Sequence, residues 1–231
     1  MIPYLELTLN NDCAIAVFNL IYYAGRWNMP FNESDTKKRS FHKIDCDTIV
    51  DMMYQELRTR YYHTNKYKTV TMSLGGDNSL ILILPKKGLT PKDFIATFDS
   101  STIKRIINNS QYTDLKLFLP KFEINDQQLL LQPLEKMGIE LFPSQFKEIR
   151  LWTRSRLIDM SMNQLSKFKI DEQGVEASVE TKSITCILLA HYEEDEPQPI
   201  VIKFDRPFIF LLRNDKTKSL IMTGIYAGPE E

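Results

Sequence analysis

The stretch that decides the fold of this chain is Lys169-Ile-Asp-Glu-Gln-Gly-Val-Glu-Ala-Ser-Val-Glu-Thr181. From Val175 onward its residues alternate in character, which is typical of a half-buried β-strand. The small or apolar set is Val175, Ala177, Val179 and Thr181, and the polar set is Glu176, Ser178, Glu180 and Lys182. The flanks instead indicate an exposed loop, because Gly174 precedes the run and an acidic, proline-bearing segment (191–199) follows it. A loop with the alternation of a strand predicts a segment that can join a sheet later.

Composition limits the possible functions. The 231 residues are enough for one domain, or two at most, and the net charge of −1 gives no support to a nucleic-acid or anionic-membrane partner. The longest apolar runs, such as 79–85, are too short to span a bilayer, and the N-terminus has no signal-peptide pattern. Cys13, Cys46 and Cys186 are a sparse, odd set that we interpret as free thiols, which mildly favours a reducing compartment.

Strand patterns dominate the rest of the chain. The apolar run 14–24 predicts a strand that is buried on both faces or lies at a sheet centre. Strands at 69–73 and 80–84 flank a Gly-Gly-Asp-Asn turn and predict a hairpin. The alternation over 114–120 predicts another strand, and 207–212 with 220–226 predict a closing strand pair.

A few helices interrupt the strands. Thr90 followed by Pro91 predicts a helix start, because threonine caps helices and proline suits their first turn. The segment 126–138 predicts a short helix that ends at Gly138, although Pro133 inside it is unfavourable. The basic run Lys37-Lys38-Arg39 predicts a solvated turn. We therefore expect an α+β fold, with residues 1–231 forming one domain.

Six segments follow one another along the chain in a recognisable order. They are Asn19-Leu-Ile-Tyr-Tyr-Ala-Gly-Arg-Trp27, Asp35-Thr-Lys-Lys-Arg-Ser-Phe-His42, Met52-Met53, Leu119-Pro-Lys-Phe-Glu-Ile124, Glu172-Gln-Gly-Val-Glu-Ala177, and Phe204-Asp-Arg-Pro-Phe-Ile-Phe210 with Met222-Thr-Gly224 and Pro229. In this order they resemble the serpin family of serine protease inhibitors. The resemblance covers the chain from Ile2 onward and implies a serpin-like mixed fold dominated by antiparallel β-sheets. Because Ile2 falls near the middle of a serpin, we expect a partial domain that lacks the N-terminal helical portion of the family.

The resemblance implies a mechanism. Serpins expose a reactive loop as bait, and after cleavage the loop inserts into the main sheet while the protease is trapped as a suicide complex. Here that loop is 172–199, and the hinge residues are Glu172, Gly174, Val175, Glu176, Ala177, Ser178, Val179 and Thr181. Counting from the hinge places the scissile bond at Leu188-Leu189, which predicts a chymotrypsin- or elastase-like serine protease, or a cysteine protease, as partner. Counting back from Phe204 instead gives a bond near Glu196.

The resemblance also implies a region where the sheet opens. Trp27 would lie where the loop enters, and Lys121 would pair there with Glu172 to hold the sheet shut. Asn19 would be a buried polar group of the central gate, with Gln164 at a position that is His in the family. The alternatives are ordinary core packing for Trp27 and ordinary surface charges for Lys121 and Glu172.

Other chemistry is disfavoured. His42, Asp45, Cys46 and Asp47 match no metal-ligand spacing, so we predict a charged loop and no metal or cofactor. No Gly-x-Ser-x-Gly occurs and no histidine has a neighbouring nucleophile motif, so we expect no enzyme. The heparin-binding helix of the family would fall in the absent portion, so we expect no heparin response.

Three hypotheses follow from the sequence. The first is a serpin-type protease inhibitor. The second is a serpin-fold binding protein without trapping activity, and the third is a truncated product that folds only with another chain. The compartment stays open, because the family has both extracellular and cytoplasmic members.

Overall fold

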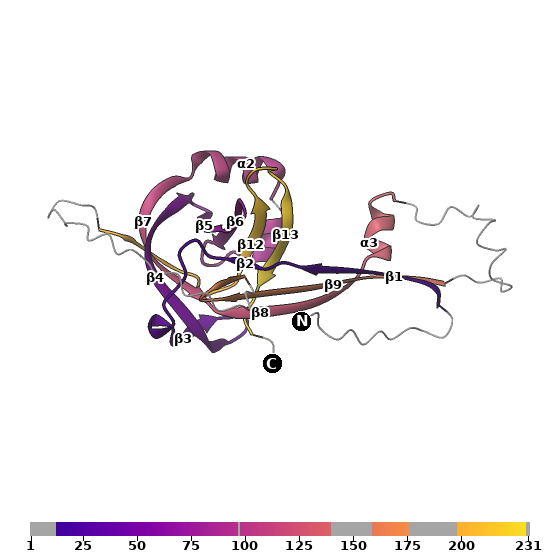
Figure 1. Cartoon of the computed structure of the whole chain (residues 1–231), viewed down its shortest axis with the longest axis horizontal. Helices are drawn as coiled ribbons and strands as arrows, with labels where there is room; N and C mark the ends of the chain where they lie inside the picture. The colour runs from indigo at the N-terminus through magenta and orange to yellow at the C-terminus, as the bar shows by residue number, and fades with distance from the viewer. Residues whose placement is uncertain (1–12, 97, 140–158, 176–197, 230–231) are drawn as a thin grey trace. The chain divides into compact units, whose positions relative to one another are not determined.

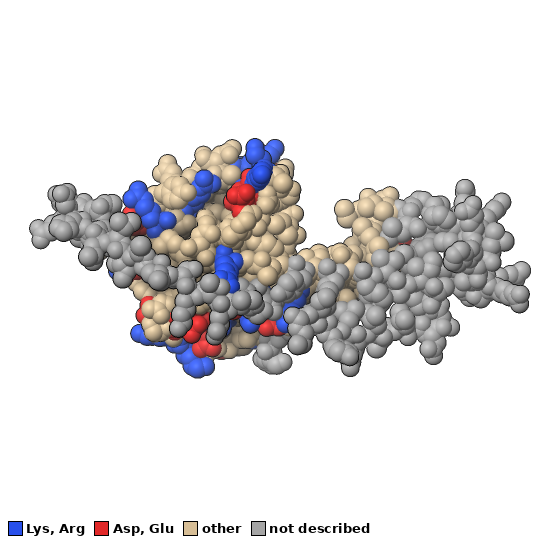
Figure 2. Space-filling model, in the orientation of Figure 1, with Lys and Arg blue, Asp and Glu red and all other residues tan. Residues whose placement is uncertain are grey.

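The computed structural model describes residues 13–96, 98–139, 159–175 and 198–229. They divide into two compact units, one from the segments 1–23 and 124–168 and the other from 24–123 and 169–231. No helix among these described residues is long and apolar enough to cross a membrane. Basic and acidic side chains lie close to one another on the face that Figure 2 views.

The larger unit is built on one sheet with the strand order β11-β7-β4-β5-β6-β12-β13, and β3 pairs with β4 (Figure 1). The strands are β3 (Lys37–His42), β4 (Asp47–His63), β5 (Tyr67–Leu74), β6 (Asn78–Pro85), β7 (Gln111–Pro120), β11 (Ile200–Lys203), β12 (Phe208–Asn214) and β13 (Leu220–Tyr226). Neighbouring strands are antiparallel except for the parallel pair β11 and β7.

The sequence patterns account for these strands. The predicted hairpin is confirmed as β5 and β6, where Leu74 pairs with Asn78 and positive φ angles occur at Gly76 and Asp77. The closing pair is confirmed as β12 and β13. In β7 the predicted alternation is confirmed, because every second residue from Leu115 to Leu119 is buried. The turn predicted at 37–39 is wrong: these residues begin β3 and pair with β4, although their side chains are solvated as expected.

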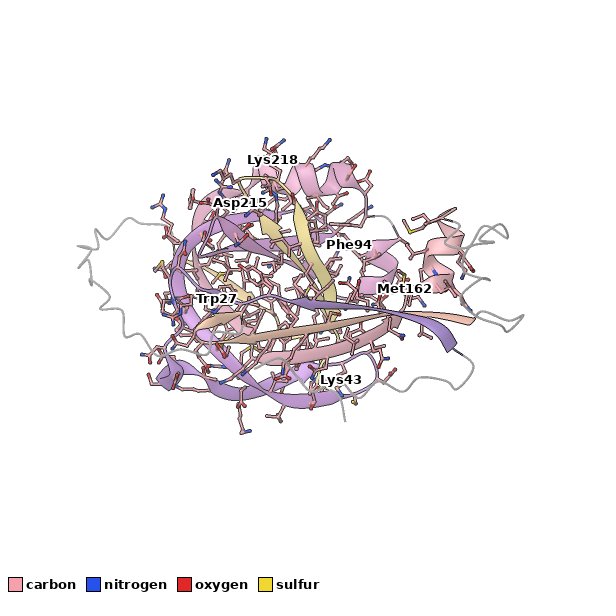
Figure 3. All side chains as sticks on the ribbon, turned by 45° about the vertical axis from the view of Figure 1, so that its right-hand side comes forward. Trp27, Lys43, Phe94, Met162, Asp215 and Lys218 are labelled. Carbon is pink, nitrogen blue, oxygen red and sulfur yellow. The ribbon has the colours of Figure 1, made fainter. Side chains whose placement is uncertain are left out.

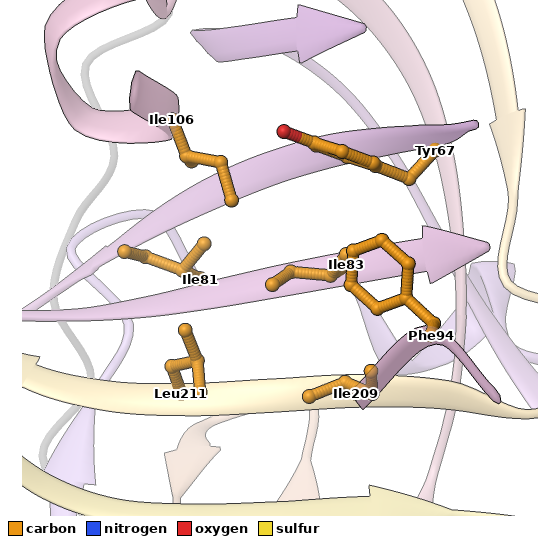
Figure 4. Close-up of a cluster of buried hydrophobic side chains, with 7 residues drawn as sticks. All are labelled: Tyr67, Ile81, Ile83, Phe94, Ile106, Ile209 and Leu211. Atoms are coloured by element: carbon orange, nitrogen blue, oxygen red, sulfur yellow. The ribbon is translucent and has the colours of Figure 1, made fainter. Parts of the chain in front are cut away.

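A cluster of buried apolar side chains joins this sheet to two helices, α1 (Pro91–Ile95) and α2 (Ser100–Asn109). Figure 4 shows its members, Tyr67, Ile81, Ile83, Phe94, Ile106, Ile209 and Leu211. The predicted cap is confirmed, because Thr90 Oγ1 accepts the backbone N–H of Asp93. The two short helices therefore depend on caps and on this cluster, since helices of this length are marginal alone.

The smaller unit contains β1 (Cys13–Tyr22), most of β9 (Asp159–Asp171), most of β8 (Phe122–Leu129) and α3 (Leu131–Lys136). β1 runs parallel to β9, and β8 also pairs with β9. The predicted strand at 14–24 is thus confirmed. Among the described residues β1 stands at the end of the strand order, so the alternative of a sheet centre is not met.

The helix predicted over 126–138 is wrong in its first half. Residues through Leu129 belong to β8, and the helix covers only Leu131–Lys136. Pro133 explains the late start, because a proline further inside a helix would clash with the preceding turn and lose a hydrogen bond. The backbone N–H of Leu130 instead donates to the Met162 carbonyl oxygen, and Gly138 ends the helix at φ +79° as expected.

The cluster in Figure 4 generates a stability prediction. Ile83 is fully buried there, so Ile83→Ala should lower the free energy of unfolding by about 2–5 kcal/mol through lost burial and a cavity. Ile49→Ala is the matched control, because Ile49 lies on β4 of the same sheet with 58% exposure. The control should cost about 1 kcal/mol or less. Urea unfolding of the whole chain measures both, and equal losses would contradict the assignment of the core.

Candidate functional site

The candidate site begins where β9 ends at Asp171 and the chain turns back into β10 (Gly174–Val175). Asp171 Oδ1 accepts the backbone N–H groups of Gln173 at 2.9 Å and Gly174 at 3.2 Å, which fixes the turn. On one side Val175 pairs antiparallel with Ile170 of β9, and on the other β10 pairs with β2 (Gly25–Arg26). The start of the predicted hinge is therefore a buried strand between two neighbours.

Gly174 permits this close approach. Its φ is +151°, and a Cβ atom there would lie 2.2 Å from the Gly25 carbonyl oxygen and 2.7 Å from the Arg26 Cα. Both contacts are with backbone atoms, which cannot rotate away as a side chain can. The glycine of the hinge segment is thus required by packing as well as by backbone conformation.

The side chain of Glu172 is 6% exposed, and both oxygens of its carboxylate accept hydrogen bonds. Its Oε2 accepts a hydrogen bond from Lys121 Nζ at 2.8 Å, and its Oε1 accepts one from Thr36 Oγ1 at 2.9 Å. Burial acts to raise the pKa of Glu172, but hydrogen bonds from Lys121, from its own backbone N–H and from Thr36 outweigh burial and lower it. The hydrogen bond to Glu172 in turn raises the pKa of Lys121, against the effect of burial. At neutral pH the pair is charged, as buried carboxylates with such partners are.

Trp27 also contacts the turn that follows Asp171. Its side chain is 4% exposed and its Nε1–H donates to the Asp171 carbonyl oxygen at 2.9 Å. Its backbone N–H donates to the Gln173 carbonyl oxygen at 3.0 Å, and its ring meets Phe31 edge-on. Figure 3 labels Trp27 among the surrounding side chains. Trp27 is thus part of the core and also contacts the turn that precedes the loop.

Asn19 and Gln164 belong to the smaller unit, where they are partners in the β1–β9 register. Asn19 Nδ2–H donates to Gln164 Oε1 at 3.2 Å. The expectation that Asn19 is buried is wrong, because the structure has its side chain exposed. Among the described residues β1 has β9 as its neighbouring strand. The side-chain amide of Asn19 therefore reaches solvent and also bonds to Gln164 of β9.

Seven of the predicted site residues lie outside the described residues. They are Glu176, Ala177, Ser178, Val179, Thr181, Leu188 and Leu189. Sequence reasoning in turn missed two contributors, Thr36 and Asp171. The Asp-x-x-Gly spacing from Asp171 to Gly174 is a signal for such a turn, whereas nothing local marks Thr36 as a partner of a residue 136 positions away.

The sequence of this chain is similar to that of a known protein family over nearly its whole length. The family model described as Serpin (serine protease inhibitor) matches residues 3–229. This chain belongs to the serpin family. Iripin-8 of Ixodes ricinus is 30% identical over 219 residues, which is 91% of this chain and 53% of that protein. The chain thus spans about half the length of the curated relatives it matches.

Solved structures confirm the serpin-like α+β fold. The mouse protein-Z dependent protease inhibitor has a TM-score of 0.75 at 21% identity, covering 92% of this chain and 55% of its own. Human thyroxine-binding globulin in complex with thyroxine has a TM-score of 0.78 at 22% identity, covering 97% of this chain and 59% of its own. The roles predicted for Asn19, Trp27, Lys121 and Gln164 stay predictions, although the structure brings Lys121 to Glu172 and Asn19 to Gln164.

The close packing at Gly174 predicts a local effect of substitution. Gly174→Ala should push β10 away from β2, so that backbone amides in 170–175 and 25–27 exchange with solvent faster. Hydrogen exchange read by mass spectrometry measures this. Gly75→Ala is the control, because nothing lies within 4 Å of its added methyl group and its φ is not positive. Unchanged exchange in Gly174→Ala would show that the approach is not as tight as described.

The lowered pKa of Glu172 predicts a pH dependence. A carboxylate whose pKa is depressed by folding stabilises the protein above its unfolded pKa, near the ordinary value of 4.5, and this stabilisation is lost as pH falls. Glu172→Gln should therefore cost about 1–2 kcal/mol at pH 7 and progressively less below about pH 4.5. Glu135→Gln on α3 serves as an exposed control. Denaturation midpoints from pH 7 to 3 check this, and a gap between wild type and variant that does not narrow would contradict it.

Proposed function

We propose that this chain inhibits a serine-type endopeptidase as a suicide substrate. The protease cleaves the segment 172–199 at Leu188-Leu189, and the freed hinge then enters the main sheet as a new strand. The observation that carries the proposal is the start of the loop: Gly174 and Val175 are already paired antiparallel with β9 before any cleavage. The family match over residues 3–229 supports the same conclusion.

The strand register supports insertion beside β9. Val175 stands opposite Ile170, and continuing that register two residues at a time sets Ala177, Val179 and Thr181 against Phe168, Ser166 and Gln164. These are the small or apolar residues of the alternating set, so the side chains that enter the sheet are those that tolerate burial.

Insertion has a definite cost in this arrangement. β9 is already paired with β1 over 160–167, and β8 pairs with β9 as well. A strand has two edges, so a longer β10 would have to take the place of β1 beside β9. The Asn19–Gln164 hydrogen bond is among those that must break. Since ordering a loop costs about as much as its new contacts return, relaxation of a strained sheet has to drive the step.

A second candidate is a serpin-fold binding protein without trapping activity. β1 favours it, because among the described residues β1 has β9 as its strand partner and no neighbour on its other edge. Of the described strands, β9 alone would then resist displacement of β1, which leaves little stored strain in this part of the chain to release. Thyroxine-binding globulin, a structural neighbour, is named for binding thyroxine.

A protease challenge with matched variants separates the two. We expect chymotrypsin or elastase to cut within one residue of Leu188 and to remain attached in a complex that survives denaturant. Val179→Arg should abolish the complex but not the cleavage, because insertion would bury an arginine against Ser166. Ser178→Arg should still trap the protease, because residue 178 belongs to the outward set. Gel electrophoresis and residual protease activity are the measurements.

The same protease challenge also has a result that would overturn the inhibitor proposal. A chain that is cleaved near Leu188 while the protease stays fully active, with no complex in wild type, overturns the inhibitor proposal and favours the binding protein. Cleavage near Glu196 would keep the mechanism and move the scissile bond.

A further inference from the structure

One exposed surface of the larger unit combines cations with aromatic rings. Its members, the cation–aromatic patch, are Arg39, Tyr54, Lys116, Phe118 and Lys203. Tyr54 of β4 stands opposite Phe118 of β7, and Phe118 stands opposite Lys203 of β11. Residues directly opposite in paired strands present their side chains on the same face, and Lys116 joins them two positions before Phe118.

The contacts of the patch centre on one ring. The Arg39 guanidinium carbon lies 4.8 Å from the Phe118 ring centroid, and Lys203 Nζ lies 5.5 Å from it. The Tyr54 ring packs against the same ring at 4.8 Å. Arg39 and Lys203 are both exposed. Stacking on a ring orients a cation without neutralising it, so both charges remain available to a partner.

The same face is positive beyond this ring. By strand register this face carries six cations, Lys37, Arg39, Arg58, Arg60, Lys116 and Lys203, against two acids, Glu56 and Asp114. Each acid faces a cation, with Lys116 3.5 Å from Glu56 and Arg58 3.9 Å from Asp114. Arg60 lies over the Tyr112 ring instead. In a chain of net charge −1, this excess of positive charge is local.

The patch lies where both ends of the proposed reactive loop are attached. Lys121, which holds Glu172 at the start of the loop, directly follows β7, the strand that carries Phe118. At the other end β11 pairs with β7, and the Phe204 backbone N–H donates to the Phe118 carbonyl oxygen at 2.9 Å. The two described ends of the proposed loop are therefore both held at or next to β7, the strand that carries Phe118.

We propose that the cation–aromatic patch is a docking surface for the target protease, which meets it with an acidic surface beside its active-site cleft. This inference rests on the proposed function and specifies the partner further. Preoriented arginine and aromatic side chains are typical of binding hot spots, and complementary charge raises association rates by 10-fold or more in favourable cases.

The experiment uses chymotrypsin with its active site blocked, in unmodified form and with its surface lysines succinylated to give acidic groups. Binding of each form to the whole chain is measured by surface plasmon resonance at low and high salt. We expect the succinylated form to bind roughly tenfold faster at low salt, with the advantage lost at high salt. Arg39→Glu and Lys203→Glu should remove the advantage. Lys38→Glu should keep it, because Lys38 is the neighbour of Arg39 on the opposite face of β3 and is also exposed to solvent.

The outcomes separate this inference from the inhibitor proposal. A blocked protease cannot be trapped, so failure of trapping leaves the binding result intact. No binding at low salt, equal binding of the two forms, or equal loss in Lys38→Glu overturns the docking surface. Succinylated albumin that binds as fast as succinylated protease also overturns it, because the patch would then attract any polyanion.

Discussion

The buried carboxylate of Glu172 is the interaction on which the rest of the candidate site depends. It joins three separate parts of the chain, since Thr36 precedes β3, Lys121 follows β7 and Glu172 follows β9. A buried charge without partners would be strongly unfavourable, so each partner is needed to keep the other two in place. Glu172 lies in the turn that Asp171 Oδ1 holds and that Trp27 contacts, two residues before the closely packed Gly174.

The order of these contacts gives the loop a defined start. Val175 is buried between two strands, where it pairs with Ile170 of β9 and Gly25 of β2. An insertion mechanism needs such a boundary, because a strand that is to lengthen must have a fixed end from which its register can continue. In this chain the boundary is set by backbone contacts with Gly25 and Arg26 and not by a large side chain.

Sequence reasoning recovered the strands wherever periodicity was local. The hairpin at Leu74–Asn78, the Thr90 cap and the alternation through Leu117 each follow from residues close together in the chain. It failed at 126–129, where pairing with β9 outweighs a helical pattern, and at 37–39, where pairing with β4 makes a basic run extended. Asn19 was expected to be buried, but its exposure depends on how many strands lie beside β1, which no local pattern contains.

The pairing of β1 with β9 has a consequence for folding. Asn19 and Gln164 are 145 residues apart in sequence, whereas the hairpin of β5 and β6 closes within a few residues. Closing so large a loop is costly in entropy, and parallel strands are slow to align, so we expect the hairpins to form early and β1 to dock late. In a chain emerging from the ribosome, β1 is made well before β9 and waits for this partner, so chaperones have a long opportunity to act at this strand.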